Sequence, residues 1–212
     1  PSSPYKIEHN ASNNSLLKDI LDGEIRHENS QYVYITNTGA TLPLSAAASS
    51  VRELTPFSFL LKNVPLNQVA LMVDEPEAHL HPMKQRMMAD LLCRMCNNGV
   101  HMQVTTHSDS LLRRINELVM KEQIYEVTSG GEEYVQLCKR LNTPEDLRLD
   151  PSIVSAYLLR RNGEMSIVEK QDMTHGVPFV SFLDAIKERL KMQAGLSSTL
   201  SKLNGGEDDD ID

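Results

Sequence analysis

The sequence contains no tryptophan, few aromatic residues and no excess of basic residues. A basic stripe with interleaved aromatic side chains is the pattern by which proteins hold a nucleic-acid backbone and stack on its bases, and no such stripe is visible here. We therefore do not expect these residues to read a nucleic-acid sequence directly. Any contact with DNA would have to come from another segment or from a partner.

Cysteine and long hydrophobic runs are also scarce. The cysteines Cys93, Cys96 and Cys138 are too few for a disulfide framework and fit a reducing compartment. Cys93 and Cys96 have the spacing of a redox motif, but their helical setting favours two small buried residues. The sequence has neither an apolar run long enough to span a bilayer nor a signal-peptide pattern. We expect a soluble, cytoplasmic chain without membrane contact.

A further absence is that of the phosphate-binding loop Gly-x-x-x-x-Gly-Lys-Ser/Thr. The clustered glycines are Gly130-Gly131 and Gly205-Gly206, and neither pair is followed by Lys-Ser/Thr. The backbone amides of that loop hold the α- and β-phosphates of a nucleotide, so this chain alone is not a complete nucleotide site. Because the chain also begins at Pro1 without a methionine, we expect it to be the later half of a longer polypeptide.

The acidic charge lies mainly at the end of the chain. The formal net charge is −8, and residues 207–212 contribute five acidic side chains and no basic ones. We expect residues 194–212, rich in Gly, Ser and acids, to be a flexible tail. Residues 1–193 are close to neutral and long enough for one substantial core or for part of a larger domain.

The stretch from Val69 to Pro82 changes from an unbroken apolar run to two adjacent acids. Val69 to Val73 is typical of a central strand in a parallel sheet covered on both faces, and Asp74 and Glu75 stand at its carboxyl end, where such sheets bind ligands. Neighbouring strand residues point to opposite sides, so we expect two roles. Asp74 suits a hydrated Mg²⁺, and Glu75 suits a water that attacks a γ-phosphate. This is the Walker B arrangement, although Asp-Glu-Pro alone also fits a polar strand end that opens a turn.

A second strand-like segment, Val100 to Thr106, ends at His107, and 33 positions separate His107 from Asp74. That spacing leaves room for one helix and one strand, a single crossover that would bring His107 beside the two acids. An imidazole there can bond to a γ-phosphate or to the attacking water. Upstream, Leu42 to Leu54 is a hydroxyl-rich turn that enters a helix, and Ser49 and Ser50 at such a helix start can bind an anion.

These three segments, in this order, resemble the C-terminal half of the ABC-type ATPase head shared by SMC, RecF-like and OLD-family ATPases. Within that group they are most similar to the prokaryotic AAA-labelled ATPases of defence and mobile-element systems. The matching segments are Ala48 to Pro56, Asp74 to Pro82 and Thr105 to Asp109. This sequence departs from the family pattern in having Ala48 where serine is commoner, no glycine between Ala46 and Glu53, and no phosphate-binding loop.

The resemblance implies an α/β fold, that of a P-loop NTPase of ABC-ATPase type without its Walker A segment, with added β-hairpins. It implies ATP and Mg²⁺ as cofactors, Asp74 as the Mg²⁺-linked acid acting through water, Glu75 as the catalytic base and His107 as the switch histidine. Ser49 and Ser50 match the signature segment, which contacts nucleotide bound to the opposite subunit. The loop from Pro76 to Leu80 would meet a second ATPase head.

The resemblance further implies an ATPase that works in anti-phage defence or DNA maintenance with an effector such as a nuclease. One alternative is a nucleotide-dependent scaffold that does not hydrolyse ATP, which the presence of Glu75 disfavours. Another is an OLD-like nuclease, which would need acidic strand ends that residues 110–212 do not offer. Glu77, His79 and His81 could be read as zinc ligands, but their spacing favours loop-fixing hydrogen bonds and dimer contacts.

The rest of the sequence predicts a simple series of elements. We expect residues 1–15 to form a loop, and we expect helices at 15–21, 54–61, 83–95, 110–119 and 180–192. We expect strand pairs at 32–36 with 40–44, 125–128 with 134–138, and 153–159 with 165–168. Ser108 is expected to cap the helix that follows it.

Overall fold

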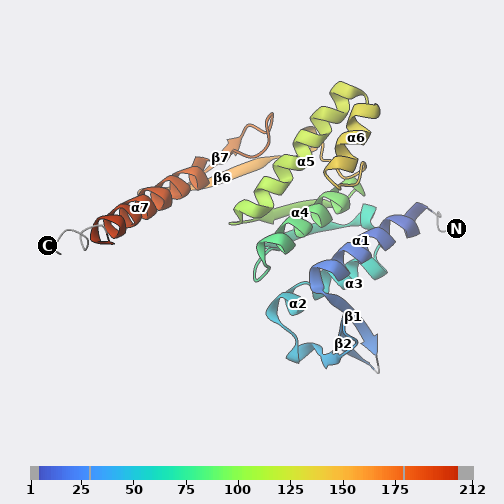
Figure 1. The fold of residues 1–212 in the computed structure, drawn as a ribbon. Coiled ribbons are helices and arrows are strands. Elements are labelled where there is room, and N and C mark those ends of the chain that lie inside the picture. The colour runs from blue at the N-terminus through green and yellow to red at the C-terminus, as the bar shows by residue number, and fades with distance from the viewer. Residues whose placement is uncertain (1–4, 29, 179, 205–212) are drawn as a thin grey trace. The chain divides into compact units, whose positions relative to one another are not determined.

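The computed structural model describes residues 5–28, 30–178 and 180–204 (Figure 1). The chain divides after Val177 into two compact units, and each is described here by itself. The first unit contains the helices α1 (Tyr5–Leu21), α2 (Ser49–Glu53), α3 (Thr55–Asn63), α4 (Pro82–Asn97), α5 (Asp109–Thr128) and α6 (Glu132–Arg140). Its strands are β1 (Gly23–Glu28), β2 (Gln31–Thr36), β3 (Thr41–Pro43), β4 (Ala70–Asp74), β5 (His101–Thr105), β6 (Ala156–Asn162) and β7 (Met165–Gln171). The second unit contains α7 (Val180–Asn204).

An antiparallel meander, β1-β2-β3, precedes the serine segment. The predicted hairpin formed by β2 and β3 is confirmed, whereas β1 was not predicted. Tyr34 anchors the meander, because its buried hydroxyl donates to the backbone oxygen of Leu21 at 2.7 Å. Gly23 allows this approach, since a Cβ at that position would lie 2.6 Å from the Cε2 atom of the Tyr34 ring.

The N-terminal helix is longer than the sequence indicated. We expected residues 1–15 to form a loop, but α1 begins at Tyr5. The prediction was wrong because the polar residues 8–14 show no helical periodicity, while tertiary packing stabilises the helix. Leu17 and Ile20 of α1 are buried in the same core as Leu61 of α3 and Met88 of α4.

The strands β4 and β5 run parallel and are joined by α4, as the spacing of their motifs predicted. Leu71 and Val73 of β4 pack against the core together with Met102 and Val104 of β5. The opposite face is open among the described residues, and Met72 is 84% exposed. The prediction of a central strand covered on both faces is therefore wrong for the first unit, whose described residues cover one face of the sheet only.

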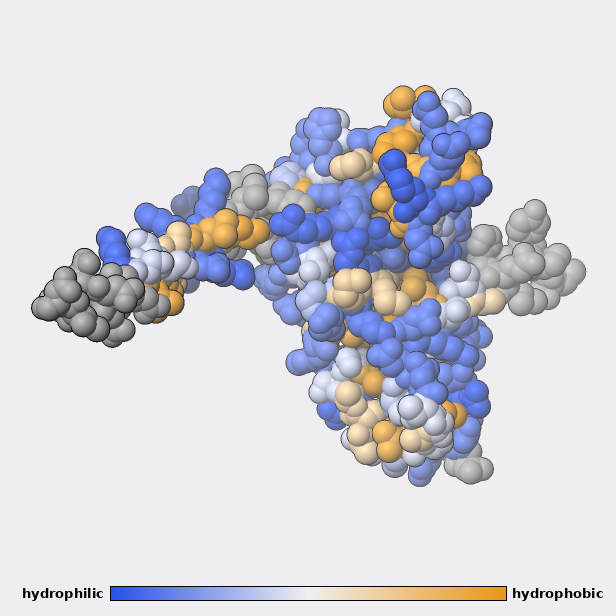
Figure 2. All heavy atoms as spheres, in the orientation of Figure 1, coloured by the Kyte–Doolittle hydropathy of each residue, from blue (hydrophilic) through white to orange (hydrophobic). Residues whose placement is uncertain are grey.

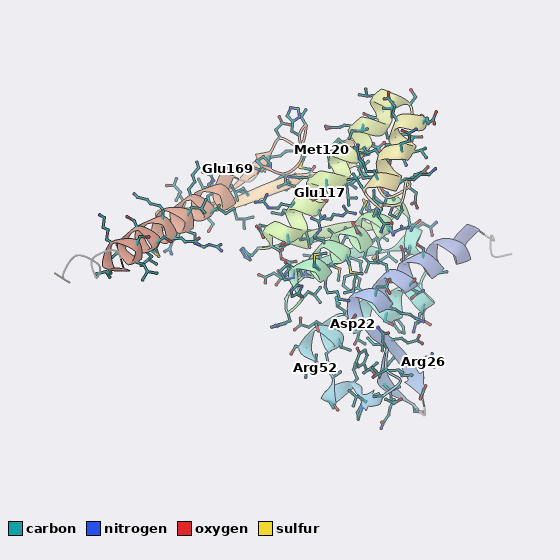
Figure 3. All side chains as sticks on the ribbon, in the orientation of Figure 1. Asp22, Arg26, Arg52, Glu117, Met120 and Glu169 are labelled. Carbon is teal, nitrogen blue, oxygen red and sulfur yellow. The ribbon has the colours of Figure 1, made fainter. Side chains whose placement is uncertain are left out.

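Helices α4 and α5 lie side by side, and both contribute fully buried residues to the core (Figure 1). Met88, Leu91 and Met95 are fully buried on α4, so the predicted apolar stripe of this helix is confirmed except at its first residue, Met83, which is 63% exposed. Burial of each such side chain contributes roughly 1.5–3 kcal/mol. The polar edges of the two helices are also joined, because Glu117 of α5, labelled in Figure 3, accepts hydrogen bonds from Arg86 of α4 at 2.7 and 2.9 Å.

The predicted strand pair at 125–128 and 134–138 is wrong, since both segments are helical. The backbone of Ser129 is left-handed (φ 50°) and ends α5, and α6 begins at Glu132. Tyr134 is fully buried, and its ring meets that of Tyr125 edge-on with 5.3 Å between centroids. The aromatic residues that favoured strands therefore hold two helices together.

The C-terminal part contains a hairpin and a helix. The predicted hairpin is confirmed as β6 and β7, with a turn at Gly163 (φ 61°). In the second unit, α7 extends to Asn204, so residues 194–204 are helical where we expected a tail, and residues 205–212 lie outside the described residues. Hydrophobic residues reach the surface over α5 and α6 and along α7 (Figure 2). Within the part of the chain that is described, no helix has both the length and the apolar content to cross a bilayer.

Candidate functional site

The site is built at the carboxyl ends of β4 and β5, where Asp74 pairs in register with Thr105. The hydroxyl of Thr105 donates to the carboxylate of Asp74. The backbone amide of Glu75 in turn donates to the backbone oxygen of Thr105 at 3.1 Å. Two strand ends are thus tied together at the first acid of the pair, and that acid remains exposed.

Glu75 leaves the strand in a sharp turn. It follows the last residue of β4 and has a left-handed backbone, with φ of 44°, which is uncommon for a residue other than glycine. Its carboxylate is 46% exposed. We expected strand alternation to separate the roles of Asp74 and Glu75, but the turn redirects the chain immediately after Asp74. Such unfavourable backbone conformations cluster at functional sites.

His107 lies beside Glu75, as the crossover spacing predicted. The Nε2 atom of His107 is 3.6 Å from the Oε1 atom of Glu75, and the imidazole is 88% exposed. We call Asp74, Glu75, Thr105 and His107 the β4–β5 cluster. An acid, a base-competent carboxylate and an imidazole open to solvent at one sheet edge can together contact a phosphate group and a water molecule.

Ser49 and Ser50 are the first residues of α2 and are half-buried. The hydroxyl of Ser49 accepts a hydrogen bond from Arg52 at 3.2 Å, and Arg52 is labelled in Figure 3. An ion pair of 3.5 Å between Glu53 and His79 links α2 to the loop after β4. Among the described residues, no hydrogen bond or ion pair joins either serine to the β4–β5 cluster.

Two residues make contacts at the site that were not predicted from the sequence: Thr105 was given no role of its own, and Glu77 was considered only as a zinc ligand or for loop-fixing hydrogen bonds. The Thr105 hydroxyl bonds Asp74, and the carboxylate of Glu77 binds the segment that contains His107. The parallel register could have identified Thr105, since a crossover that aligns the strands places it opposite Asp74. Glu77 gave no such signal, because its partners are 29 and 30 positions away and one is a backbone amide.

The loop-fixing roles expected for the Glu77-x-His79-x-His81 segment are present. Glu77 is 5% exposed and accepts hydrogen bonds from the following loop. The Nδ1 atom of His81 accepts from the amide of Met83 at 3.4 Å and caps α4. No three His, Cys, Asp or Glu side chains among the described residues converge in a way that would hold a metal ion.

The donor set at Asp74 fits Mg²⁺. This ion keeps several waters and takes one or two carboxylates together with substrate phosphates, so it needs no cage of three protein ligands. Asp74 offers an exposed carboxylate and Thr105 a hydroxyl beside it. Bound there, the ion would offset negative charge on the phosphates.

The Cys93-x-x-Cys96 segment is helical, as expected, with Cys93 buried and Cys96 half-buried. Burial, together with the nearby charge of Asp90, raises the pKa of the Cys93 thiol to about 12. Its Sγ donates to the backbone oxygen of Arg148 at 3.3 Å. A thiol with such a pKa is inert at neutral pH, so this pair belongs to the core.

Parallel strands joined by a helix, with an Asp-Glu pair at their carboxyl edge, define an α/β fold of the P-loop NTPase class and ABC-ATPase type. A family model described as "AAA ATPase domain" matches residues 3–112, which is just over half of the chain. The chain belongs to this family of ATP-binding ATPases. The matched residues include α2, β4, α4, β5 and all four members of the β4–β5 cluster.

A search of curated proteins found no match. Among solved structures, the chain is similar to an SMC ATPase studied for ATP-driven dimerization and DNA-stimulated activation, with 12% identity, a TM-score of 0.48, and coverage of 84% of this chain and 91% of that chain. It is also similar to the Smc head domain of Pyrococcus furiosus bound to the C-terminal domain of ScpA, with 12% identity, a TM-score of 0.47, and coverage of 84% and 37%. The SMC head domain of Thermotoga maritima has 18% identity, a TM-score of 0.33, and coverage of 50% and 39%. The chain thus spans most of the first of these structures and less than two-fifths of the other two.

Proposed function

We propose that this chain is the C-terminal portion of an ABC-type ATPase head and hydrolyses ATP once a phosphate-binding segment and a second head complete it. The single observation that carries the proposal is the approach of Glu75 and His107 to 3.6 Å, next to Asp74, at the carboxyl edge of parallel strands. Each group has a distinct task there. Glu75 orients a water molecule and takes its proton as the oxygen attacks the γ-phosphorus.

His107 is proposed to stabilise the same reaction by contacting the phosphate. Its imidazole extends into solvent and can donate a hydrogen bond to a γ-phosphate oxygen, where negative charge has to be held during transfer. Asp74 would hold the Mg²⁺ through water. Glu75 and His107 therefore supply proton transfer and charge stabilisation within one contact distance of each other.

The open face of the β4–β5 sheet supports the need for a further segment. Parallel strands are normally covered on both faces, yet Met72 and Asp74 point away from the core of this chain. We propose that the missing phosphate-binding loop and its helix cover this face. The nucleotide would then lie between that loop and the β4–β5 cluster.

The serine segment is proposed to serve the opposite head. Ser49 and Ser50 are not joined to the β4–β5 cluster of their own chain, but α2 begins with their hydroxyls and amides. In a pair of heads they would contact the γ-phosphate bound by the partner. The Glu53–His79 ion pair connects this segment to the loop that would meet the second head, so the two contact surfaces would be adjacent.

We further propose, from the resemblance to defence and mobile-element ATPases, that hydrolysis drives or gates an effector such as a nuclease in anti-phage defence or DNA maintenance. Nucleic acid would be contacted by that effector or by another segment. The cysteines, none of which forms a disulfide, suit a reducing compartment, and we propose the cytoplasm.

The test is Glu75→Gln in the complete protein, with its phosphate-binding segment. We expect ATP turnover to fall at least about 100-fold because the base is lost, while ATP remains bound and the heads stay associated. Glu169→Gln on β7, an exposed acid labelled in Figure 3, is the matched control and should leave turnover unchanged. Turnover at the wild-type rate in Glu75→Gln would show that Glu75 is not the base, and the absence of ATP turnover in both proteins would instead favour a nucleotide-dependent scaffold.

A further inference from the structure

We infer that Glu77 is the positioning residue that holds His107 against Glu75, an inference that rests on the proposed function. Glu77 lies in the loop after β4, two positions beyond the proposed base. Its side chain is 5% exposed, while Glu75 in the same loop is 46% exposed. The loop therefore directs one acid to solvent and buries the other beneath it.

The buried carboxylate holds the loop that follows β5. The Oε1 atom of Glu77 accepts a hydrogen bond from the hydroxyl of Thr106 and another from the backbone amide of His107 at 3.2 Å. Hydrogen bonds to a charged acceptor are stronger than those between neutral groups. The backbone at residue 107 is thus fixed directly by Glu77.

This backbone contact matters because little else holds the imidazole. His107 is 88% exposed, so packing holds its imidazole little, and the position of its backbone limits how closely the imidazole can approach Glu75. Glu77 and Glu75 belong to one short loop. The same loop therefore supplies the proposed base and fixes the residue that faces it.

A second set of hydrogen bonds makes the arrangement rigid. Thr106 accepts from the amide of Ser108 at 3.0 Å, and the hydroxyl of Ser108 donates to Gln85 at 2.6 Å. Gln85 donates to the backbone oxygen of Leu80 at 2.9 Å, which returns to the loop after β4. These hydrogen bonds therefore lead from Glu77 in the loop after β4 to the loop after β5, and back through Gln85 to Leu80 in the first loop.

The second carboxylate oxygen of Glu77 argues against a role in stability alone. Its Oε2 atom is buried and has no hydrogen-bond partner among the described residues. A buried polar atom without a partner lowers stability, and such atoms in native proteins call for an explanation. The hydrogen bonds by which Glu77 joins the two loops explain why a carboxylate is present here although its Oε2 atom lowers stability.

The experiment is a double-mutant cycle in the complete protein, with Glu77→Ala, His107→Ala and the double variant. We expect Glu77→Ala to lower kcat about tenfold or more with little change in KM for ATP, because small misplacements of catalytic groups are costly. If Glu77 acts through His107, the double variant should match His107→Ala within about twofold. If the losses of kcat in the two single variants multiply in the double variant, or if Glu77→Ala changes KM alone, the inference is overturned.

Two further variants separate positioning from folding. Glu77→Gln retains an oxygen that accepts both hydrogen bonds, so it should keep most of kcat. Thr106→Val removes one of the two donors to Glu77 at nearly constant side-chain size, and it serves as the test if Glu77→Ala does not fold. We expect Thr106→Val to lower kcat in the wild type but not in a His107→Ala background. If that loss persists there, or if Glu77→Gln is as impaired as a folded Glu77→Ala, the inference is wrong.

The failure of this inference differs from the failure of the proposed function. If Glu75→Gln abolishes turnover while Glu77→Ala leaves kcat unchanged, only the positioning role is lost. If Glu75→Gln hydrolyses ATP at the wild-type rate, the proposed function itself fails, and the positioning role fails with it.

Discussion

At the scale of single residues, Thr105 connects both acids of the site. Its hydroxyl donates to Asp74 and also lies 3.3 Å from the amide of Glu75, from which it accepts. The side chain of one strand end thereby fixes the carboxylate of the neighbouring strand and the first turn beyond it. A threonine satisfies both contacts because a hydroxyl donates and accepts at the same time.

We predict that Thr105→Val lowers ATP turnover by the complete protein about tenfold, since Asp74 and Glu75 lose their common anchor while the shape of the side chain is kept. Steady-state kinetics against ATP measures this effect. The exposed position of Thr105 predicts little change in the free energy of unfolding, which urea titration checks. A fully active variant would show that the hydroxyl does not position the acids.

The sequence predicted which residues lie together at the site only where a strand pattern and a spacing place them. Asp74 and Glu75 follow an apolar run, and one crossover from them leads to His107, so their proximity could be predicted. Glu77 could not be predicted in this way, because its partners are set by how two loops fold over each other. The proposed roles of Ser49 and Ser50 remain predictions, since they depend on a second head.

At the scale of helices and strands, sequence patterns predicted the structure well where burial and intrinsic propensity favour the same element. The apolar stripe of α4 and the Asn-Gly turn between β6 and β7 each have a local cause. The patterns failed for α6, where Tyr134 and Cys138 are four residues apart and share a buried helical face. The preference of aromatic residues for strands is weak compared with tertiary packing, and in this segment packing against α5 favours the helix.

The edge of the meander provides a pH-dependent contribution to stability. Hydrogen bonds from Arg26, and then from Lys18, lower the pKa of Glu24 on β1 from 4.5 to about 2. A carboxylate whose pKa is lower in the folded chain stabilises the fold above pH 4.5, and this contribution is lost as the pH falls towards about 2.

We therefore predict that Glu24→Gln is less stable than the wild type at neutral pH and that the difference shrinks between pH 4.5 and about 2. Urea titrations of both proteins across this range measure the difference. Glu169→Gln, which disrupts an exposed ion pair of 3.5 Å, should show a smaller effect at neutral pH. A difference between Glu24→Gln and the wild type that stays constant with pH would contradict the assignment.

At the scale of the whole molecule, membership of the AAA ATPase domain family and the α/β fold agree with the class predicted from the sequence. Because the sequence contains no phosphate-binding loop, we also predicted that the site is incomplete, and this remains a prediction. The structure adds the open face of the β4–β5 sheet, which a central-strand pattern did not predict. Parallel sheets are normally covered on both faces, and we propose that a further segment covers the open face in the complete protein.

The most direct test of the proposed site is a structure of the complete protein with Mg²⁺ and a non-hydrolysable ATP analogue. We predict that the carboxylate of Glu75 and the imidazole of His107 both lie within hydrogen-bonding reach, about 3 Å, of the γ-phosphate or of the water aligned with it. Side chains of Glu75 and His107 that face away from the phosphate, or a nucleotide bound elsewhere, would contradict the account.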